Sequence, residues 1–255
     1  MQAEKVFVAF TEVEPGRHRD YNTWHQLDHR PENLALPGVI WGERWVRSPD
    51  CAKVSSGDDD SLTSSHYVTL YWFRAPVEAA WAQWLDLGAR SYQWGRRPEL
   101  PYVKRPFGKP FVPVRGYVHP RVLVSADVLP LRPNRGVHIT ISDVSGGTVA
   151  VEELFEWYNE VRIPDWLSCP GVAGAWTLVS EEEFRGHRPG QPSPTSTRAT
   201  VLFFDEDPVD VVAEIEARTA DWAKSGRDRD VAKLERIRFA SPLRSIVPWQ
   251  WDWFD

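Results

Sequence analysis

The chain has 255 residues, 42% of them hydrophobic, and a formal net charge of −6 from 30 basic and 36 acidic residues. This composition supports a substantial core in one or two domains, and the lack of a basic stripe excludes nucleic acid as an expected partner. No apolar run approaches the ~20 residues of a membrane helix, and the N-terminus lacks signal-peptide features, so we expect a cytoplasmic protein that does not enter a membrane.

Alternating β-branched and aromatic residues, with proline and glycine between them, define the expected elements of the first half. A strand leads into a helix that ends at Pro37 and Gly38, because proline cannot continue a helix and glycine supplies the turn. Two strands separated by a polar loop follow, then a helix that begins after Pro76 and a closing strand. The expected ranges are Val6–Val13 (strand), Tyr21–Leu34 (helix), Val39–Val46 (strand), Ser48–Ser65 (loop), Tyr67–Phe73 (strand) and Val112–Val118 (strand).

The second half shows the same order of elements. Its first helix ends at Pro170 and Gly171, and its second helix begins after Pro208. We therefore divide the chain into a first unit (residues 1–119), a proline-containing linker (120–135) and a second unit (136–255). The expected ranges are Val137–Val144 (strand), Val151–Leu167 (helix), Val172–Val179 (strand), Ser180–Ser196 (loop), Arg198–Phe204 (strand) and Leu243–Val247 (strand).

The two halves also match residue by residue. Trp24–Val39 aligns with Trp157–Val172 at an offset of 133 positions, with Trp, Pro, an acidic residue, Leu and Pro-Gly-Val in common. Four collinear matches of this kind predict a tandem duplication, because a chance match would not keep its register along the chain. The other three pairs are Val8–Val13 with Ile139–Val144, Thr69–Phe73 with Thr200–Phe204, and Pro113–Val118 with Pro242–Val247.

The order of elements predicts an α+β fold. A βαββαβ unit forms a four-stranded antiparallel sheet with both helices on one face, the ferredoxin-like arrangement, and leaves the other face of its sheet uncovered. A second unit on the same chain is the natural cover for that face. We therefore expect two tandem ferredoxin-like units that form one barrel within the chain.

The helix and turn that occur in both copies resemble those of dimeric α+β barrel proteins, in particular the EthD-like and stress-responsive branches. The tryptophan, the His29-Arg30-Pro31 sequence and the Pro-Gly pair carry the resemblance. It implies two ferredoxin-like units in one barrel, usually supplied by two chains, and a place among polyketide cyclases, small monooxygenases, lactone isomerases and haem-using enzymes. In the second copy Arg162 stands where the first has His29, which puts any role of that histidine in doubt there.

Two histidines of the first predicted helix are candidate functional residues. His25 and His29 are four residues apart beside Asp28 and Glu32, a spacing that zinc or iron could use, although we expect no metal. A helical wheel places His29 toward solvent, opposite the apolar stripe that includes Trp24 and Leu27. The proline two residues later removes a backbone donor, and the resulting distortion could turn His29, and Arg162 in the second copy, toward a cleft.

Strand alternation supplies a second set of candidates. Each strand has an apolar face, such as Val137, Ile139 and Ile141, and a more polar face. We expect the apolar face to lie under the helices and the polar face to line a cavity inside the barrel, with few polar groups among aromatic rings. The residues expected in that cavity are His138, Thr140, Arg198, Tyr67, Thr69, Tyr71 and Phe73.

These residues suggest roles in proton transfer. His138 or His29 would act as general base or acid, and Tyr67 and Tyr71 would hold a developing oxyanion. The alternative is a histidine and tyrosine that satisfy each other inside a core without catalysis. The residues expected to contact a substrate are Arg198, Thr140, Thr69, Phe73, Arg162, Trp24 and Trp157.

Nucleotide-binding and hydrolase motifs are missing from the sequence: it contains no P-loop, no G-x-G-x-x-G after a strand and no G-x-S-x-G. These absences disfavour a nucleotide-dependent or serine-hydrolase mechanism. The resemblance, together with the cavity expected above, implies a cofactor-independent enzyme of the cyclase, isomerase or monooxygenase type, acting on a hydrophobic, aromatic or polyketide-like small molecule. A non-catalytic protein that binds a hydrophobic ligand or serves in assembly is the alternative, and a haem-binding enzyme is the third. The sequence is compatible with both a monomer and a homodimer.

Overall fold

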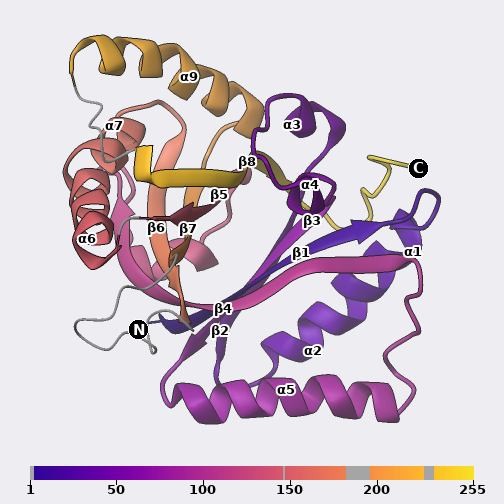
Figure 1. Ribbon diagram of the computed structural model, residues 1–255. Coiled ribbons are helices and arrows are strands. Elements are labelled where there is room, and N and C mark those ends of the chain that lie inside the picture. Colours follow the sequence, from indigo (N-terminus) through magenta and orange to yellow (C-terminus); the bar gives the residue numbers. More distant parts are fainter. Residues whose placement is uncertain (1–2, 146, 182–195, 227–232) are drawn as a thin grey trace.

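The computed structural model describes residues 3–145, 147–181, 196–226 and 233–255. In this part of the chain eight strands form one closed barrel (Figure 1), in which every pair of neighbouring strands is antiparallel. The strands are β1 (Ala3–Val13), β2 (Val39–Val46), β3 (Tyr67–Arg74), β4 (Val103–Val118), β5 (Gly136–Val144), β6 (Val172–Ser180), β7 (Ser196–Phe204) and β8 (Glu235–Ser245).

Each half contributes one four-stranded sheet to the barrel. The order around the barrel is β1-β3-β2-β8-β5-β7-β6-β4, so the first half has the sheet order β4-β1-β3-β2 and the second has β8-β5-β7-β6. The two sheets join where β4 pairs with β6 and where β2 pairs with β8. This is the predicted α+β barrel of two ferredoxin-like units, and the predicted fold class is confirmed.

The main helices cover the outside of the barrel, those of the first half on one side and those of the second half on the other, whereas the short helices between β2 and β3 lie beside the second half (Figure 1). In each half the first helix is interrupted by a π-helical segment at the same place in the order of elements. The first-half helices are α1 (His18–Trp24), the π segment η1 (His25–His29), α2 (Arg30–Leu34) and α5 (Val77–Gln93). Their counterparts are α6 (Gly147–Trp157), the π segment η3 (Tyr158–Arg162), α7 (Ile163–Leu167) and α9 (Pro208–Lys224).

The interior of the barrel is filled with apolar side chains from both halves. Phe10 packs against Phe239 with their ring centroids 4.8 Å apart, and Trp72 packs against Trp176 at 5.6 Å. Val137, together with Ile139 and Ile141, belongs to this same cluster. The expectation that the apolar strand faces lie under the helices was therefore wrong.

The polar strand faces, predicted to line the interior, face the helices instead. Leu202 and Phe204 pack with Trp157 of α6, and Tyr71 and Phe73 pack against the helix α5. The physical reason is that a closed barrel interior is the driest space in the molecule, so the most apolar face of each strand occupies it. Alternation correctly separated the two faces but does not say which of them points inward.

Short elements occupy segments that the sequence suggested were irregular. Two short helices lie in the predicted loop Ser48–Ser65, a 3₁₀ helix lies in the linker, and β4 begins at Val103 rather than at Val112. Most of the second predicted loop, Ser180–Ser196, lies outside the described residues. The additional elements are α3 (Pro49–Lys53), α4 (Asp60–Thr63) and the 3₁₀ helix η2 (Ala126–Leu131).

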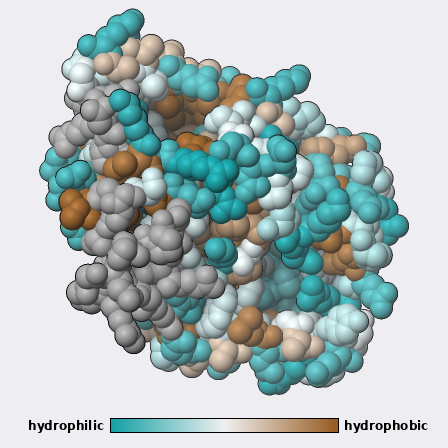
Figure 2. Space-filling view, viewed as in Figure 1, coloured by the Kyte–Doolittle hydropathy of each residue, from teal (hydrophilic) through white to brown (hydrophobic). Residues whose placement is uncertain are grey.

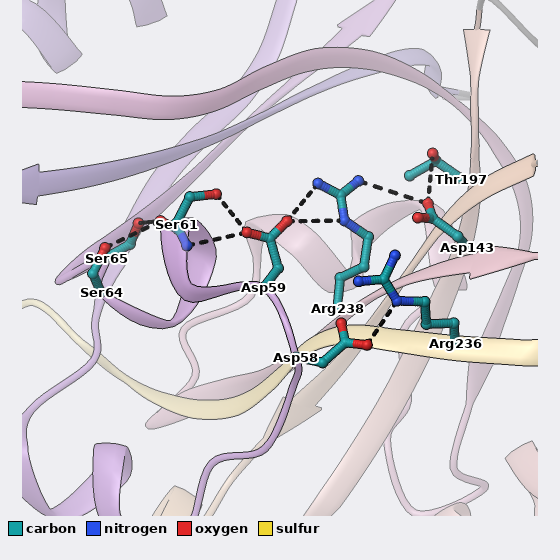
Figure 3. Close-up of polar contacts among 9 residues, drawn as sticks. All are labelled: Asp58, Asp59, Ser61, Ser64, Ser65, Asp143, Thr197, Arg236 and Arg238. Atoms are coloured by element: carbon teal, nitrogen blue, oxygen red, sulfur yellow. Dashed lines mark hydrogen bonds and ion pairs between the residues drawn. The ribbon is translucent and has the colours of Figure 1, made fainter.

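Ion pairs connect the segment between β2 and β3 to the second half of the chain (Figure 3). Arg238 of β8 donates to the carboxylate of Asp59 from Nη2 at 2.7 Å and lies 3.6 Å from Asp143 of β5. The neighbouring Arg236 donates to Asp58 at 2.6 Å. Partly exposed pairs of this kind each contribute about 0–1 kcal/mol, so their main effect is to fix how this segment lies on β8.

The C-terminal residues pack against the start of the first helix. The ring of Phe254 lies 4.4 Å from the ring of His18, and Trp251 is buried beside Tyr67 and Ile246. The side-chain carboxylate of Asp255 accepts hydrogen bonds from the backbone N–H groups of Gly16, His18 and Arg19 at 2.8, 3.0 and 3.2 Å. An acidic group suits this position, because the N-terminus of a helix has unpaired N–H donors.

The surface gives little sign of a large apolar contact area. On the face shown in Figure 2, hydrophobic residues form separate small patches among hydrophilic ones. Among the residues that the structure describes, no helix is both long enough and apolar enough to cross a membrane.

Candidate functional site

A cavity of about 770 Å³ lies in the first half, between the outer face of the sheet and the helices that cover it. We call it the first-half cavity. Its floor comes from β1 and β3, one wall from the helix α1-η1-α2, and the other from α5 and the chain leading into β4. Its volume is typical of a small-molecule site, and its lining combines aromatic rings with a few polar groups. The lining residues used below are Phe7, Trp24, His25, His29, Asn33, Thr69, Tyr71, Trp84, Gly88, Tyr92, Arg97 and Arg105.

The π-helical segment brings both histidines of the first helix to this cavity. The backbone N–H of Arg30 donates to the carbonyl of His25, five residues earlier, instead of to the carbonyl four residues earlier. The π turn lies just before Pro31, whose ring nitrogen cannot donate to the carbonyl of Leu27. An extra residue in the turn rotates the side chains that follow, and π segments of this kind are frequent at functional sites.

This rotation explains why the helical wheel failed. The wheel placed Leu27 on the buried stripe and His29 toward solvent, whereas Leu27 is 41% exposed and His29 lines the cavity. The sequence also suggested a distortion of the helix near Pro31 that turns His29 toward a cleft, and the π-helical segment is such a distortion. In the second half the N–H of Ile163 donates to the carbonyl of Tyr158, again five residues back, so the same irregularity occurs there.

The two imidazoles and a tryptophan form an aromatic group on the cavity wall. The ring of His29 stacks on Trp24 with centroids 4.6 Å apart, and the ring of His25 meets His29 edge-on at 5.2 Å. Burial, followed by the charges of Arg97 and Arg105, lowers the pKa of His29 to about 3. Burial is also the main cause that lowers the pKa of His25 well below its usual value. Both rings are therefore neutral at pH 7 with a lone pair that can accept a proton, and the lowered pKa makes each a weaker base than a free imidazole.

Tyr71 lines the same cavity and carries a phenol hydroxyl with no partner among the described residues. Its hydroxyl is buried and forms no hydrogen bond with any described residue. Burial raises the pKa of Tyr71, so the group stays protonated and can donate. Its ring packs beside Trp84, with centroids 5.8 Å apart, and Thr69 precedes it on the same strand face. An unpaired buried hydroxyl is costly unless a ligand or water completes it, which makes Tyr71 a candidate ligand contact.

Tyr67, the other predicted catalytic tyrosine, has its hydroxyl already engaged. The amide of Asn22 donates to it at 2.9 Å, and Nδ1 of His18 lies at the same distance. Its ring also stacks with the guanidinium of Arg44, which binds the side-chain oxygen of Asn22. Tyr67 therefore supports the helix behind the cavity and does not line it.

The remaining predicted residues belong mainly to the second half. His138 lies opposite Leu202 on the helix-facing side of β5, and burial lowers its pKa to about 4. Thr140, which is buried, follows on the same face. Phe73 is the exception, since it belongs to the first half and packs with Trp81 of α5. The predicted constellation is thus divided between the two halves, and only Trp24, His29, Thr69 and Tyr71 meet in the first-half cavity.

At two positions the second half has an arginine where the first half has another residue. Arg162 corresponds to His29, and Arg198 corresponds to Tyr67. Arg198 is fully buried against the rings of Phe155 and Tyr158, at 4.2 and 4.3 Å. Arg162 stacks on Trp157 at 4.6 Å. Arg198 and Arg162, which the sequence predicted to contact a substrate, therefore pack against aromatic side chains of the protein itself.

The spacing that suggested a metal site serves another purpose. Glu32 pairs with Arg96 at 2.6 Å, and Asp28 lies 3.7 Å from the same guanidinium. Within the described ranges no group of three His, Cys, Asp or Glu side chains converges as metal ligands would.

Sequence reasoning missed several residues of the cavity. Arg97, Arg105, Asn33 and Trp84 line it but were not named. Arg97 comes from the connection between α5 and β4, where no periodic pattern indicates which side chains point inward, and Arg105 comes from the start of β4, which the sequence did not predict to be a strand. The pair of tryptophans three residues apart on α5, Trp81 and Trp84, was the one available signal, since that spacing places them on one helix face.

A glycine beneath Tyr71 provides a test of how tightly its ring is held. A Cβ added at Gly42 would lie 2.2 Å from the Tyr71 ring, so Gly42→Ala must displace that ring. We expect the free energy of unfolding to fall by about 1–3 kcal/mol, as for other overpacked sites, when measured by urea denaturation. Gly88→Ala is the matched control, because its Cβ would meet open space in helix α5, and it should stabilise by about 0.5–1 kcal/mol. Equal stability of the Gly42 variant and the native chain would contradict the packing.

No protein-family model matches the sequence. A search of curated proteins finds no match either. Among solved structures the chain is similar to a provisionally assigned monooxygenase from Fusobacterium nucleatum, with a TM-score of 0.55 and 9% identity over 97% of this chain and 94% of that one. It is also similar to a provisionally assigned chlorite dismutase (TM-score 0.51, 14% identity, 96% of each chain). A third similar structure is an encapsulated DyP-type peroxidase from Mycobacterium smegmatis (0.52, 6%, 96% and 93%).

At these low identities the three likenesses establish the fold and no more. They agree with the strand order in placing the chain among barrels of the dimeric α+β type.

Proposed function

We propose that the first-half cavity is the active site of a cofactor-independent enzyme, of the cyclase, isomerase or monooxygenase type, that acts on a hydrophobic, aromatic small molecule by proton transfer. One observation carries the proposal. His29, with a neutral imidazole, and Tyr71, whose buried hydroxyl has no partner among the described residues, both line one aromatic cavity of ligand size.

The chemistry assigns one role to each group. The imidazole of His29 accepts a proton from a carbon next to a substrate carbonyl, and the electron pair of the broken C–H bond moves onto the carbonyl oxygen. The hydroxyl of Tyr71 donates a hydrogen bond to the enolate oxygen that forms. Rings such as Trp24 and Phe7 provide stacking surfaces that fix the plane of an aromatic substrate. His29 is preferred to His25 as the base because His25 is only 4% exposed.

A test of this proposal needs no knowledge of the natural substrate. 2-Tetralone is a bicyclic aromatic ketone whose C1 protons are acidic, and their exchange in heavy water is followed by proton NMR. Purified protein should accelerate this exchange above the rate in buffer. A protein that binds 2-tetralone without accelerating exchange would favour the alternative function, a non-catalytic protein that binds hydrophobic ligands.

The lowered pKa of His29 predicts the pH dependence of this reaction. The imidazole is neutral at any pH well above about 3, so kcat/KM for the free enzyme should be flat between pH 5 and 8. It should fall only as the pH drops toward the pKa, because the base is then protonated. A histidine at its ordinary pKa of about 6.5 would instead lose half of its activity near that pH. Initial exchange rates across this range distinguish the two.

A haem-binding enzyme is the third function that the sequence suggested, since haem-using enzymes occur among the proteins that the sequence resembles. A ligating imidazole normally donates its second ring N–H to a carboxylate, a carbonyl or water. Nδ1 of His25 has no partner among the described residues, and the ring of His29 faces the amide nitrogen of Asn33, a donor, at 3.3 Å. The residues present do not fit an oriented haem ligand. A Soret band in the purified protein would contradict this conclusion.

A further inference from the structure

The charged side chains that line the first-half cavity in the described chain are arginines. Arg97 and Arg105 line it, and no aspartate or glutamate is among its lining residues in the described chain. Neither guanidinium forms an ion pair with a carboxylate of the described residues, although nearby arginines do: Arg30 pairs with Glu43 at 2.8 Å and Arg96 with Glu32 at 2.6 Å.

A third arginine lies directly behind the cavity wall. Arg44 is fully buried between the rings of Tyr21, which lines the cavity, and Tyr67, at 4.8 and 4.7 Å. It binds the neutral side chain of Asn22, and its Nε and Nη1 have no hydrogen-bond partner in the described residues. Its side chain contacts no carboxylate there.

The second half shows how the same fold handles a buried arginine elsewhere. Arg198 is equally buried but lies 3.8 Å from the carboxylate of Glu235. The buried Lys5 likewise pairs with Glu181 at 3.0 Å. Charges removed from water are strongly penalised without a counter-charge, and Arg44, behind the cavity wall, is the one of these three buried cations with no carboxylate beside its side chain among the described residues.

We infer that the ligand of the first-half cavity is an aromatic carboxylate. This inference rests on the proposed function only in placing the ligand in the same cavity. The aromatic body would lie among Trp24, Trp84 and Phe7, and the carboxylate would be bound by Arg97 and Arg105. Guanidinium groups bind carboxylates through paired, charge-assisted hydrogen bonds.

The position of these arginines orients the ligand. Both also line a neighbouring hollow of about 370 Å³ that opens beside the cavity and includes Tyr92 and Glu99. They therefore mark the boundary between the cavity and this outer hollow, and Arg105 itself is exposed. A carboxylate held at this boundary leaves the ring system pointing inward, toward His29 and Tyr71.

A bound anion would also act on the base. Arg97, Arg105 and Arg44 are, after burial, the groups that lower the pKa of His29. A carboxylate beside them offsets their charge, so the imidazole becomes a stronger base when such a ligand is present.

The test compares two probes that differ in charge and hardly in shape, 2-naphthoate and 2-naphthamide. Their affinities are measured by isothermal titration at pH 7.5, supported by quenching of tryptophan fluorescence. We expect 2-naphthoate to bind at least about tenfold more tightly, the ratio that one charge-assisted contact supplies. The variants Arg97→Gln and Arg105→Gln should each bind naphthoate about tenfold more weakly and bind naphthamide with unchanged affinity.

Two further variants control the interpretation. Arg90→Gln removes an exposed cation that pairs with Asp86 on α5, away from the lining residues, and should leave both affinities unchanged. Arg105→Lys keeps the positive charge and should retain most of the preference for naphthoate. Equal affinity for the two probes, or no measurable binding of either, would overturn the inference.

The binding test is independent of catalysis. A preference for naphthoate in a protein that exchanges no protons of 2-tetralone would retain the ligand class and reject the enzyme. Proton exchange without a preference for naphthoate would retain the enzyme and reject the ligand class.

Discussion

Replacing His29 with glutamine should lower the rate of enzyme-catalysed proton exchange by about 10²–10⁴-fold, the usual contribution of a positioned general base. Glutamine is polar and of similar length, so it can keep a contact with Asn33 while it lacks a group that accepts the proton. The measurement is the initial rate of deuterium incorporation at C1 of 2-tetralone, with substrate binding followed separately by fluorescence.

The matched control for this variant lies in the other half of the barrel. Burial also lowers the pKa of His138, but this residue lies under the helices of the second half, so His138→Gln should leave the exchange rate unchanged. An unchanged rate in the His29 variant, with binding intact, would remove the imidazole from the mechanism. Loss of activity in the His138 variant alone would move the active site to the second half.

Replacing Tyr71 with phenylalanine should lower the exchange rate by about 10²–10³-fold, the cost of losing one donor to a developing oxyanion. The change removes a hydroxyl that no described residue binds and keeps the ring that packs beside Trp84. The free energy of unfolding should therefore stay the same or rise by up to about 1 kcal/mol, since an unsatisfied buried group is removed.

Tyr67→Phe should give the reverse pattern. The hydroxyl of Tyr67 is bound by Asn22 and lies beside Nδ1 of His18, so its removal leaves buried polar groups unpaired. We expect a loss of about 1–3 kcal/mol in the free energy of unfolding, with a much smaller change in the exchange rate. If Tyr67→Phe loses activity while Tyr71→Phe retains it, the assignment of the oxyanion donor is wrong.

The fold could be predicted from the sequence because its signals are local and repeated. Alternation marked the strands, Pro37 and Gly38 marked the end of the first helix, and the order of elements within each half defined the sheet. Tandem duplication stays a prediction, since shared element order does not by itself demonstrate it.

The candidate site was predictable only in part, for two physical reasons. Alternation assigns residues such as Thr69 and Tyr71 to one face, but the choice between barrel interior and helix cover depends on which space is drier. A wheel with 3.6 residues per turn misplaced His29, because a π turn advances the chain by an additional residue. Arg97 comes from a connection whose path only the folded chain defines, and Arg105 from a part of β4 that the sequence did not predict to be a strand.

The first half and the second half share an architecture but differ in chemistry. Where the first has His29 and Tyr67, the second has Arg162 and Arg198, which stack on aromatic rings of the helix α6. One half thus supplies the proposed site, while the other supplies the complementary sheet of the barrel.

Closure of the barrel ties the two halves together. Contacts such as Phe10 with Phe239 and Trp72 with Trp176 cross from one half to the other. Residues 1–119 expressed alone would present these rings to water along a whole sheet surface and would aggregate or recruit a substitute partner. In the intact chain every described barrel strand has a neighbour on each side, so a second copy could associate through helices or loops but not by extending the sheet.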